Sequence, residues 1–232
     1  MQKNNINPKK ELNINPKEIF AFFDFDGTLI KKESFALFLL FSAGYLKVIL
    51  NIIPLLYSYI LYKLDIITNM SAKERAITKL LKGFSKEYLE NLAKAFATKK
   101  LDKLINPQVY SRLEYHLEHG HTIVIVSANL SLYLNYWSRM HNVDEVLASV
   151  IDYEDGVCNG KLVGLNCYGK QKVKRIIEYL NHNKLNMQYS YGYGNSKGDY
   201  EMLFYTDEAY WFNGNSLIPW SEYKNDRKSK RK

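Results

Sequence analysis

Short apolar runs alternate along this chain with stretches whose apolar residues recur at helical spacing. The runs are rich in β-branched and aromatic residues, and the helical stretches between them are amphipathic. Strands that alternate with helices favour a parallel sheet covered on both faces, with its ligand site at the carboxyl ends of the strands. The predicted strands begin with "IFAFF" at 19–23 and continue with "HTIVIVSAN" at 121–129, "YSYGYG" at 189–194 and "AYWFNG" at 209–214.

A long helical segment interrupts this alternation after the first run. Residues 70–118 show helical spacing, with Ser85 as a candidate N-cap and Pro107 in a first turn. An all-helical segment cannot belong to the strand and helix alternation, so it is predicted to be an insertion. The predicted fold class is α/β, a Rossmann-like parallel sheet core with an inserted all-helical cap domain. The predicted boundaries are a flexible leader at 1–18, core segments at 19–31 and 119–218, the cap at 32–118 and a basic tail at 219–232.

The first part of the predicted cap is unusually apolar. In "SFALFLLFSAGYLKVILNIIPLLYSYILYKL", residues 34–64, Lys47 is the only charged residue before Lys63. Lys47, Asn51 and Pro54 divide it into pieces shorter than the ~20 uninterrupted apolar residues that a spanning helix needs. Packed cap helices are the favoured interpretation, and a surface that lies on lipid or a true membrane span are the alternatives.

Composition adds limits on compartment and partners. The 232 residues include 47% hydrophobic ones, enough for a real core, and the formal charge is +8. Much of that charge lies in "KNDRKSKRK" at 224–232, which is predicted to be a solvated, disordered terminus with anionic-surface binding as the alternative. No specific nucleic acid is expected. Two cysteines and a polar start without an apolar signal core favour a reducing, cytoplasmic location, with peripheral association at the inner face of a membrane left open.

Residues with side chains suited to catalysis or binding occur in four segments, each at the end of a predicted strand or at the start of a predicted helix. Asp24 and Asp26 are two residues apart at the end of the first strand, where they would project together, and Gly27 permits a sharp turn. Two carboxylates this close are tolerable if a divalent cation neutralises them or if one is protonated for acid work. The other groups are Ser127, Ala128 and Asn129, then the lysines 170, 172 and 174, and finally "GNSKGD" at 194–199. Their convergence at one sheet edge is the strong signal.

The stretch "DFDGTL" resembles the first motif of the haloacid dehalogenase superfamily of phosphohydrolases. The resemblance runs from about Ile19 to Asn215. "GLNCYGKQKV" and "YGYGNSKGDYEML" are similar to the phosphoserine-phosphatase-like branch, and the apolar cap resembles that of bacterial phosphatidylglycerophosphate phosphatases. The resemblance implies a Mg²⁺-dependent phosphatase that works through an aspartyl phosphate. Its substrate would be a phosphorylated small molecule or a phosphorylated lipid head group.

The resemblance also implies residue roles. Asp24 would be the nucleophile, Asp26 the general acid and base, and the third-motif lysine would neutralise the phosphoryl group. The branch's spacing favours Lys172 for that role, with Lys170 as the alternative. Thr28, Ser127, Ala128 and Asn129 would bind the phosphate, and Ser196 and Asp199 would support the last motif. Mg²⁺ would be held by the second carboxylate oxygen of Asp24, the backbone carbonyl of Asp26, an oxygen of the last motif at Asn195, and water molecules.

One position departs from the family pattern. The last motif usually has Asp after Gly, where this chain has Asn195. An amide oxygen can reach a metal but brings no charge, so Mg²⁺ affinity is expected to be lower. A catalytically dead phosphate-binding protein is the alternative function. The spacing of His116, His119 and His121 invites a metal site, but surface or capping roles are predicted because the three straddle a helix end and a strand start.

Overall fold

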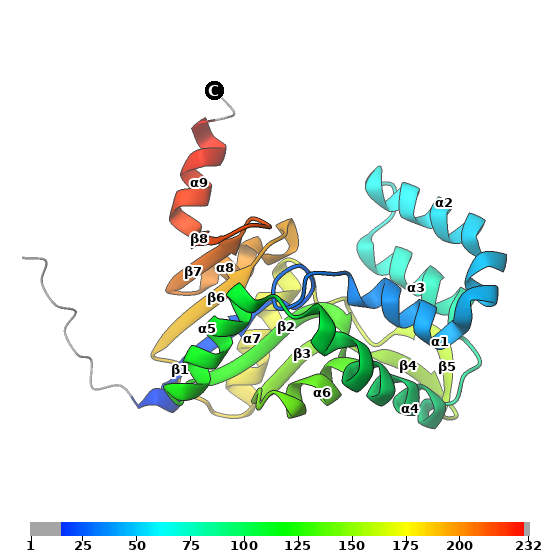
Figure 1. Ribbon diagram of the computed structural model, residues 1–232, viewed down its shortest axis with the longest axis horizontal. Helices are drawn as coiled ribbons and strands as arrows, with labels where there is room; N and C mark the ends of the chain where they lie inside the picture. Colours follow the sequence, from blue (N-terminus) through cyan, green and yellow to red (C-terminus); the bar gives the residue numbers. More distant parts are fainter. Residues whose placement is uncertain (1–14, 230–232) are drawn as a thin grey trace, which may run out of the picture.

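The computed structural model describes residues 15–229, with side chains to residue 224. A six-stranded sheet in the order β3-β2-β1-β6-β7-β8 forms its centre (Figure 1). Its first five strands in that order are parallel and β8 is antiparallel to β7. They comprise β1 Ile19–Phe23, β2 Thr122–Leu130, β3 Glu145–Ser149, β6 Tyr189–Gly194, β7 Glu208–Phe212 and β8 Leu217–Pro219. The predicted α/β class with a mostly parallel sheet is confirmed.

Helices cover both faces of the sheet, as the alternation of side chains along β1 shows. Phe20 and Phe22 pack on one face with residues of α7 Lys170–His182 and α8 Tyr200–Tyr205. Ala21 and Phe23 face the opposite way, toward α5 Pro107–Glu118 and α6 Ser131–Met140. A strand buried on both faces reads as a continuous apolar run, which is the pattern that "IFAFF" carries.

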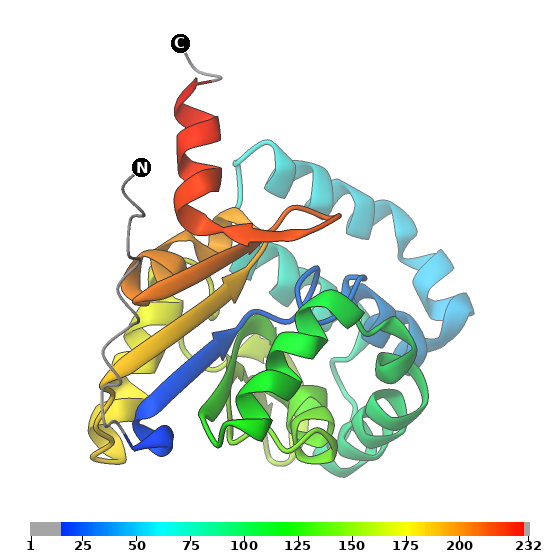
Figure 2. The same ribbon diagram turned by 60° about the vertical axis from the view of Figure 1, so that its left-hand side comes forward.

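The segment between β1 and β2 folds as helices. They are α1 Ser34–Leu50, α2 Ile52–Lys63, α3 Asn69–Leu80, α4 Lys86–Phe96 and α5. Helices α1 to α3 stand beside the sheet on the side to which its strands lead (Figures 1 and 2). The hairpin of β4 Ile151–Glu154 and β5 Val157–Leu162 packs against α3, and its turn is at Asp155 and Gly156.

Helix α5 departs from the predicted boundary of the insertion at 118. It packs against β2, with Val109 and Leu113 in the main core. Its apolar side therefore covers the sheet, and the inserted helices end nearer residue 106. Helix α4 likewise packs against α6. Periodicity predicts these helices but does not say against which surface each one packs.

The apolar segment is divided at Asn51, where α1 ends and α2 begins. Asn51 is one of the three predicted break points. Gly44, at φ 76° and ψ 160°, breaks helical geometry inside α1. Within residues 15–229 no single helix has the length and apolar composition to cross a bilayer, whereas α1 and α2 pass that test as a pair bent by 104°.

Both ends of the described chain are more ordered than the sequence predicts. Glu18 of the predicted leader accepts hydrogen bonds from Asn186 and Gln188, while residues 1–14 lie outside the described part. At the other end, helix α9 Trp220–Ser229 extends into the part of the tail for which the sequence predicts disorder. The cause is aromatic packing, because Trp220 is buried and Tyr223 stacks on Trp211 with ring centroids 4.2 Å apart.

Candidate active site

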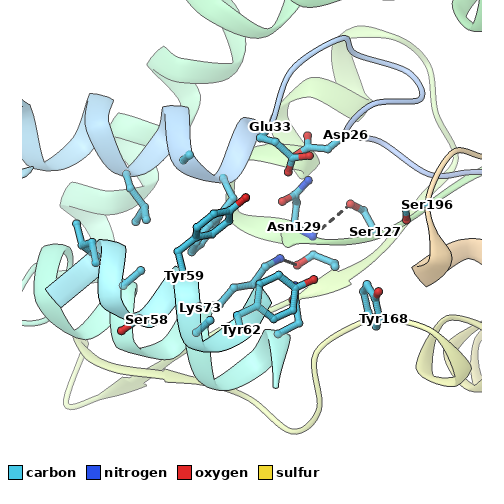
Figure 3. Close-up of a pocket in the computed structure, with 18 of the residues that line it drawn as sticks. Asp26, Glu33, Ser58, Tyr59, Tyr62, Lys73, Ser127, Asn129, Tyr168 and Ser196 are labelled. Carbon is cyan, nitrogen blue, oxygen red and sulfur yellow. Dashed lines mark hydrogen bonds between the residues drawn. The ribbon is translucent and has the colours of Figure 1, made fainter. Parts of the chain in front are cut away.

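A cavity of about 610 Å³ lies between the carboxyl ends of the strands and helices α1 to α3. Its volume is in the range typical of small-molecule sites. Three loops from the sheet form its polar floor: those after β1, within the end of β2 and after β6. Figure 3 shows side chains from the floor and from the inserted helices pointing toward the same space. The predicted convergence of separate loops at one sheet edge is therefore what the structure contains.

Lys172 holds the floor of the cavity together. Its side chain is 2% exposed, and Nζ donates to Asp24 Oδ1 at 2.7 Å, Asp199 Oδ1 at 2.6 Å and the Val126 carbonyl at 2.6 Å. Burial alone would lower the pKa of Lys172, but the two carboxylates raise it above its ordinary value, so the ammonium stays charged. Burying a cation between two carboxylates carries a large desolvation penalty, and such groups are commoner at functional sites than in ordinary cores.

Lys170 and Lys174, the other lysines of that predicted group, lie away from the cavity. Lys170 lines a separate surface depression with Glu201 and Phe204. Lys174 pairs with Glu178 at 3.7 Å on the exposed side of α7. Geometry thus places Lys172, and not Lys170, beside Asp24.

Asp24 is buried at the point where β1 ends. The strand ends at Phe23, so Asp24 no longer belongs to it. The Asp24 backbone N–H donates to the Tyr193 carbonyl. Its Oδ2 accepts from Thr28 Oγ1 at 3.2 Å, and Oδ1 faces Lys172. Burial and the negative charge of Asp199 raise the pKa of Asp24 to about 6, although Lys172 acts in the opposite direction.

Asp26 also lines the cavity but has different surroundings. Its Oδ2 accepts from the Ser34 N–H at 2.7 Å, at the start of α1, and its buried Oδ1 has no hydrogen-bond partner. Burial raises the pKa of Asp26 to about 7, against the effect of the Ser34 hydrogen bond. A carboxyl group with that pKa can hold or release a proton near neutral pH, as a general acid and base must.

The last residues of β2 bring three more predicted residues to the cavity. Ser127, Ala128 and Asn129 all line it, and Ser127 Oγ accepts from the Asn129 N–H at 3.2 Å. The pairing of β2 with β3 changes register between Ser127 and Leu130. That irregularity turns the backbone at the position where side chains reach the cavity.

The last predicted motif forms a tight, capped turn. Asp199 Oδ2 accepts from the backbone N–H groups of Asn195 and Ser196 and from Ser196 Oγ, while Oδ1 accepts from Lys172. With both oxygens engaged, Asp199 orients the loop and Lys172. Ser196 and Asn195 line the cavity.

Residues that suit a hard cation lie together on this floor. Among residues 15–224, no group of three or more histidine, cysteine or acidic side chains could hold a metal ion. The donors at hand are the oxygens of Asp24, Asp26 and Asn195, all of which line the cavity. Asn195 Oδ1 accepts from Thr28 Oγ1 at 3.2 Å, and its amide packs so close to Gly27 that a Cβ there would lie 2.1 Å from Nδ2. A carboxylate oxygen of Asp24 with the neutral amide oxygen of Asn195 is a hard oxygen donor set of the kind that Mg²⁺ takes.

Three charged residues of the inserted segment line the cavity as well: Glu33, Lys63 and Lys73. Lys73, from α3, donates to the Ala128 carbonyl at 2.5 Å and lies 5.1 Å from the centre of the Phe35 ring. Burial lowers the pKa of Lys73 to about 8, against the carboxylates of Asp26, Glu33 and Asp24. Glu33 lies beside Asp26 at the rim (Figure 3). No sequence signal marked Lys73, because it is one of several lysines spaced along a helix.

His119 is exposed at the C-cap of α5, as predicted, whereas the buried His116 and His121 contradict the predicted surface roles. His116 is fully buried, with Nδ1 2.7 Å from His121 Nδ1 and Nε2 2.9 Å from the Tyr193 hydroxyl. Burial lowers the pKa of His116 to about 3, so the ring is neutral. Because α5 packs on the sheet next to β2, the helix end and the strand start face each other. These rings are core hydrogen-bonding partners on the far side of Phe23, outside the cavity lining.

Comparison with known proteins gives relatives in sequence and in fold. Residues 21–203 match the model of the haloacid dehalogenase-like hydrolase family. Protein CicA of Caulobacter vibrioides (strain NA1000 / CB15N) is 32% identical over 193 residues, which cover 82% of this chain and 84% of CicA. A protein of unknown function from Bordetella pertussis Tohama I has a similar fold, with a TM-score of 0.72 at 22% identity over 83% of this chain and 89% of that one.

A substrate-bound phosphoserine phosphatase also shares the fold, with a TM-score of 0.61 at 16% identity, covering 86% of this chain and 87% of that one. At such identities the structural likeness speaks for the fold alone. The family match spans most of the chain and includes Asp24, Asp26, Ser127, Lys172 and Asn195. The predicted membership is confirmed: the chain belongs to the family of haloacid dehalogenase-like hydrolases.

Proposed function

We propose that this protein is a Mg²⁺-dependent phosphatase that hydrolyses phosphate monoesters through a covalent intermediate on Asp24. The observation that carries the proposal is the Asp24 carboxylate on the cavity floor, held by the charged Lys172 that also binds Asp199. A carboxylate fixed next to a permanent cation is placed to attack an anionic phosphorus centre, because the cation offsets the repulsion between the two anions.

The first chemical step transfers the phosphoryl group to Asp24. A carboxylate oxygen of Asp24 attacks phosphorus and the bond from phosphorus to the ester oxygen breaks. Asp26 gives its proton to the departing alcohol, which its pKa of about 7 permits. The separate surroundings of the two carboxyl groups fit this division of roles: Asp24 accepts a hydrogen bond from the Lys172 ammonium, whereas Asp26 accepts one from the Ser34 backbone N–H.

In the second step Asp26, now a carboxylate, takes a proton from a water molecule that attacks the phosphorus. The bond from phosphorus to Asp24 breaks, which releases inorganic phosphate and restores both groups. Ser127, Ala128 and Asn129 border the space where the phosphoryl oxygens would lie, whereas Thr28 is buried outside the cavity lining and contacts the Asp24 carboxylate. Asp24, Asp26 and Asn195 would hold Mg²⁺, which when bound supplies positive charge to the phosphoryl group.

The substrate class follows from the wall opposite the floor. Besides Glu33, Lys63 and Lys73, most of the residues that the inserted segment contributes to the cavity are apolar or aromatic. A phosphorylated small molecule with amino and carboxylate groups would use Glu33 and Lys73 as partners of opposite charge. A phosphorylated lipid head group would use the apolar remainder. Both substrates share the phosphomonoester chemistry at the floor.

The test is hydrolysis of p-nitrophenyl phosphate by the purified full-length protein with Mg²⁺. Lys172→Met should reduce kcat/KM at least about 10²-fold, the effect of removing one preorganised electrostatic partner. Lys170→Met is the matched control, since it removes a lysine two residues away that lies outside the cavity. Equal activity of the two variants, or no hydrolysis by the unmodified protein, would contradict the proposal; the second result would favour a phosphate-binding protein.

A further inference from the structure

Helices α1 and α2 expose an apolar face that nothing in the described chain covers. The outer face is defined here by Leu46, Ile49, Leu50, Ile53, Leu56 and Tyr57, all of them more than half exposed. Leu50 and Ile53 reach 75% and 79%. Soluble monomers rarely expose large apolar patches, and those that occur usually mark a binding surface.

The same two helices line the cavity with their inner side. Val48, Leu55 and Tyr62 contribute to the cavity wall, between the outer face and the carboxylates on the floor. Tyr59 belongs to both, since it lines the cavity and is 54% exposed. The outer face therefore adjoins, through α2, the apolar wall of a cavity that also contains Asp24 and Asp26. Figure 3 shows Tyr59 and Tyr62 of α2 beside that cavity.

We propose that the outer face docks on the surface of an anionic phospholipid bilayer and that the cavity takes its phosphate from a phosphorylated lipid there. The lipid-substrate half of this proposal rests on the proposed phosphatase function; the docking half does not. The alcohol part of a lipid phosphomonoester would meet the apolar wall, and its phosphate the polar floor.

Composition and charge favour a bilayer over a protein partner. Residues 34–64 contain two lysines and no acidic residue, and α1 with α2 passes the hydropathy test for membrane segments as a bent pair. Tyrosines at 45, 57 and 59 are exposed along it, and tyrosine suits the boundary between head groups and acyl chains. Lys63 lies over the Tyr59 and Tyr62 rings at the cavity rim, where an anionic head group would pass.

The C-terminal sequence adds positive charge that would strengthen this contact. Residues 224–232 contain six basic residues and one acidic one. Helix α9, which carries the first part of that sequence, stands at the upper end of the molecule in both views, as α2 does, but on the β8 side of the sheet (Figures 1 and 2). Basic residues near an anionic surface add electrostatic attraction that salt screens, so high salt should weaken the docking but leave the apolar contribution.

The experiment is sedimentation of the full-length protein with vesicles of phosphatidylcholine and phosphatidylglycerol, at low and high salt. Leu50→Glu with Ile53→Glu should lower the bound fraction by about tenfold or more, because two exposed apolar side chains are lost from the contact. Val163→Glu with Leu165→Glu is the control, since it changes two exposed apolar residues outside α1 and α2 and should bind as the unmodified protein does.

Turnover by the same proteins tests the substrate. Phosphate release from phosphatidic acid in those vesicles should fall about tenfold in the Leu50→Glu, Ile53→Glu variant, in step with binding. The variant should hydrolyse soluble p-nitrophenyl phosphate at a rate within about twofold of that of the unmodified protein, because neither residue lines the cavity.

Each contrary result separates the parts of the proposal. If the protein stays in the supernatant at both salt concentrations, docking is overturned. Docking is also overturned if the unmodified protein is a dimer that does not bind vesicles and the Leu50→Glu, Ile53→Glu variant is a monomer. Vesicle binding with hydrolysis of p-nitrophenyl phosphate but not of phosphatidic acid overturns the lipid substrate alone. If neither ester is hydrolysed, the proposed function and the lipid substrate both fail, while sedimentation still decides docking.

Discussion

Replacing Asp24 by asparagine should stabilise the folded protein while it abolishes turnover. Asp24 is 7% exposed, and burial with the charge of Asp199 raises its pKa from 3.8 to about 6. Keeping this carboxylate ionised in the fold therefore costs free energy, about 1.4 kcal/mol for each pKa unit. The two-unit shift therefore lowers the free energy of unfolding by about 3 kcal/mol at pH 8, where the group is charged in both the folded and the unfolded state.

The pH dependence has a definite sign. Because the pKa is higher in the folded state, the folded chain binds more protons between about pH 4 and 6, and stability falls as pH rises through that window. The neutral amide of the Asp24→Asn variant carries no such penalty. The gain in stability from this substitution should be about 3 kcal/mol at pH 8, about half of that at pH 5, and near zero below pH 4.

The assay is urea unfolding of both proteins with EDTA at pH 8 and pH 5. Glu118→Gln is the matched control, because it removes one negative charge at an exposed position and should change stability by less than about 0.5 kcal/mol. Mg²⁺ should stabilise the unmodified protein more than Asp24→Asn, since the variant lacks a charged donor. An Asp24→Asn protein that is no more stable than the unmodified one at pH 8 would refute the reasoning that burial strains this carboxylate.

Three further substitutions probe the other groups of the cavity. Asp26→Asn should lower kcat by about 10²–10⁴-fold for an alkyl phosphate but much less for p-nitrophenyl phosphate, whose leaving group needs no proton; equal losses would argue against acid catalysis. Asn195→Asp should lower the Mg²⁺ concentration for half-maximal activity, because it adds a charge beside a hard cation, and an unchanged requirement would place Asn195 outside the metal shell. Lys73→Met should raise KM severalfold with little change in kcat, since Lys73 faces the substrate space; a loss confined to kcat would mean that it acts on the reacting atoms.

The site was predictable where it depends on strand order. Loops after parallel strands meet at one edge, so Asp24, Ser127 and Asn195 could be brought together from alternation alone. The choice of Lys172 over Lys170 rested on motif spacing, and in the structure it follows from the helix phase of α7, which turns Lys172 inward and leaves Lys170 outside.

Features that depend on packing between distant elements were not predictable. Lys73 looks like any exposed lysine of an amphipathic helix until α3 is placed over β2. His116 and His121 become neighbours only because α5 returns along the sheet. Trp220 packs on Trp211 of the preceding strand β7, an aromatic contact that the charge pattern of the tail does not predict. Cys158 and Cys167 are buried and free. The predicted cytoplasmic location stays a prediction.

Trapping the phosphorylated enzyme tests the central claim most directly. The full-length protein would be mixed briefly with a phosphate monoester and Mg²⁺, quenched in acid, digested and analysed by mass spectrometry. We expect one phosphoryl group on the peptide that contains Asp24, and none on the same peptide from Asp24→Asn. Hydrolysis of the ester with an unmodified Asp24 and a phosphoryl group on another residue would contradict the role assigned to this carboxylate.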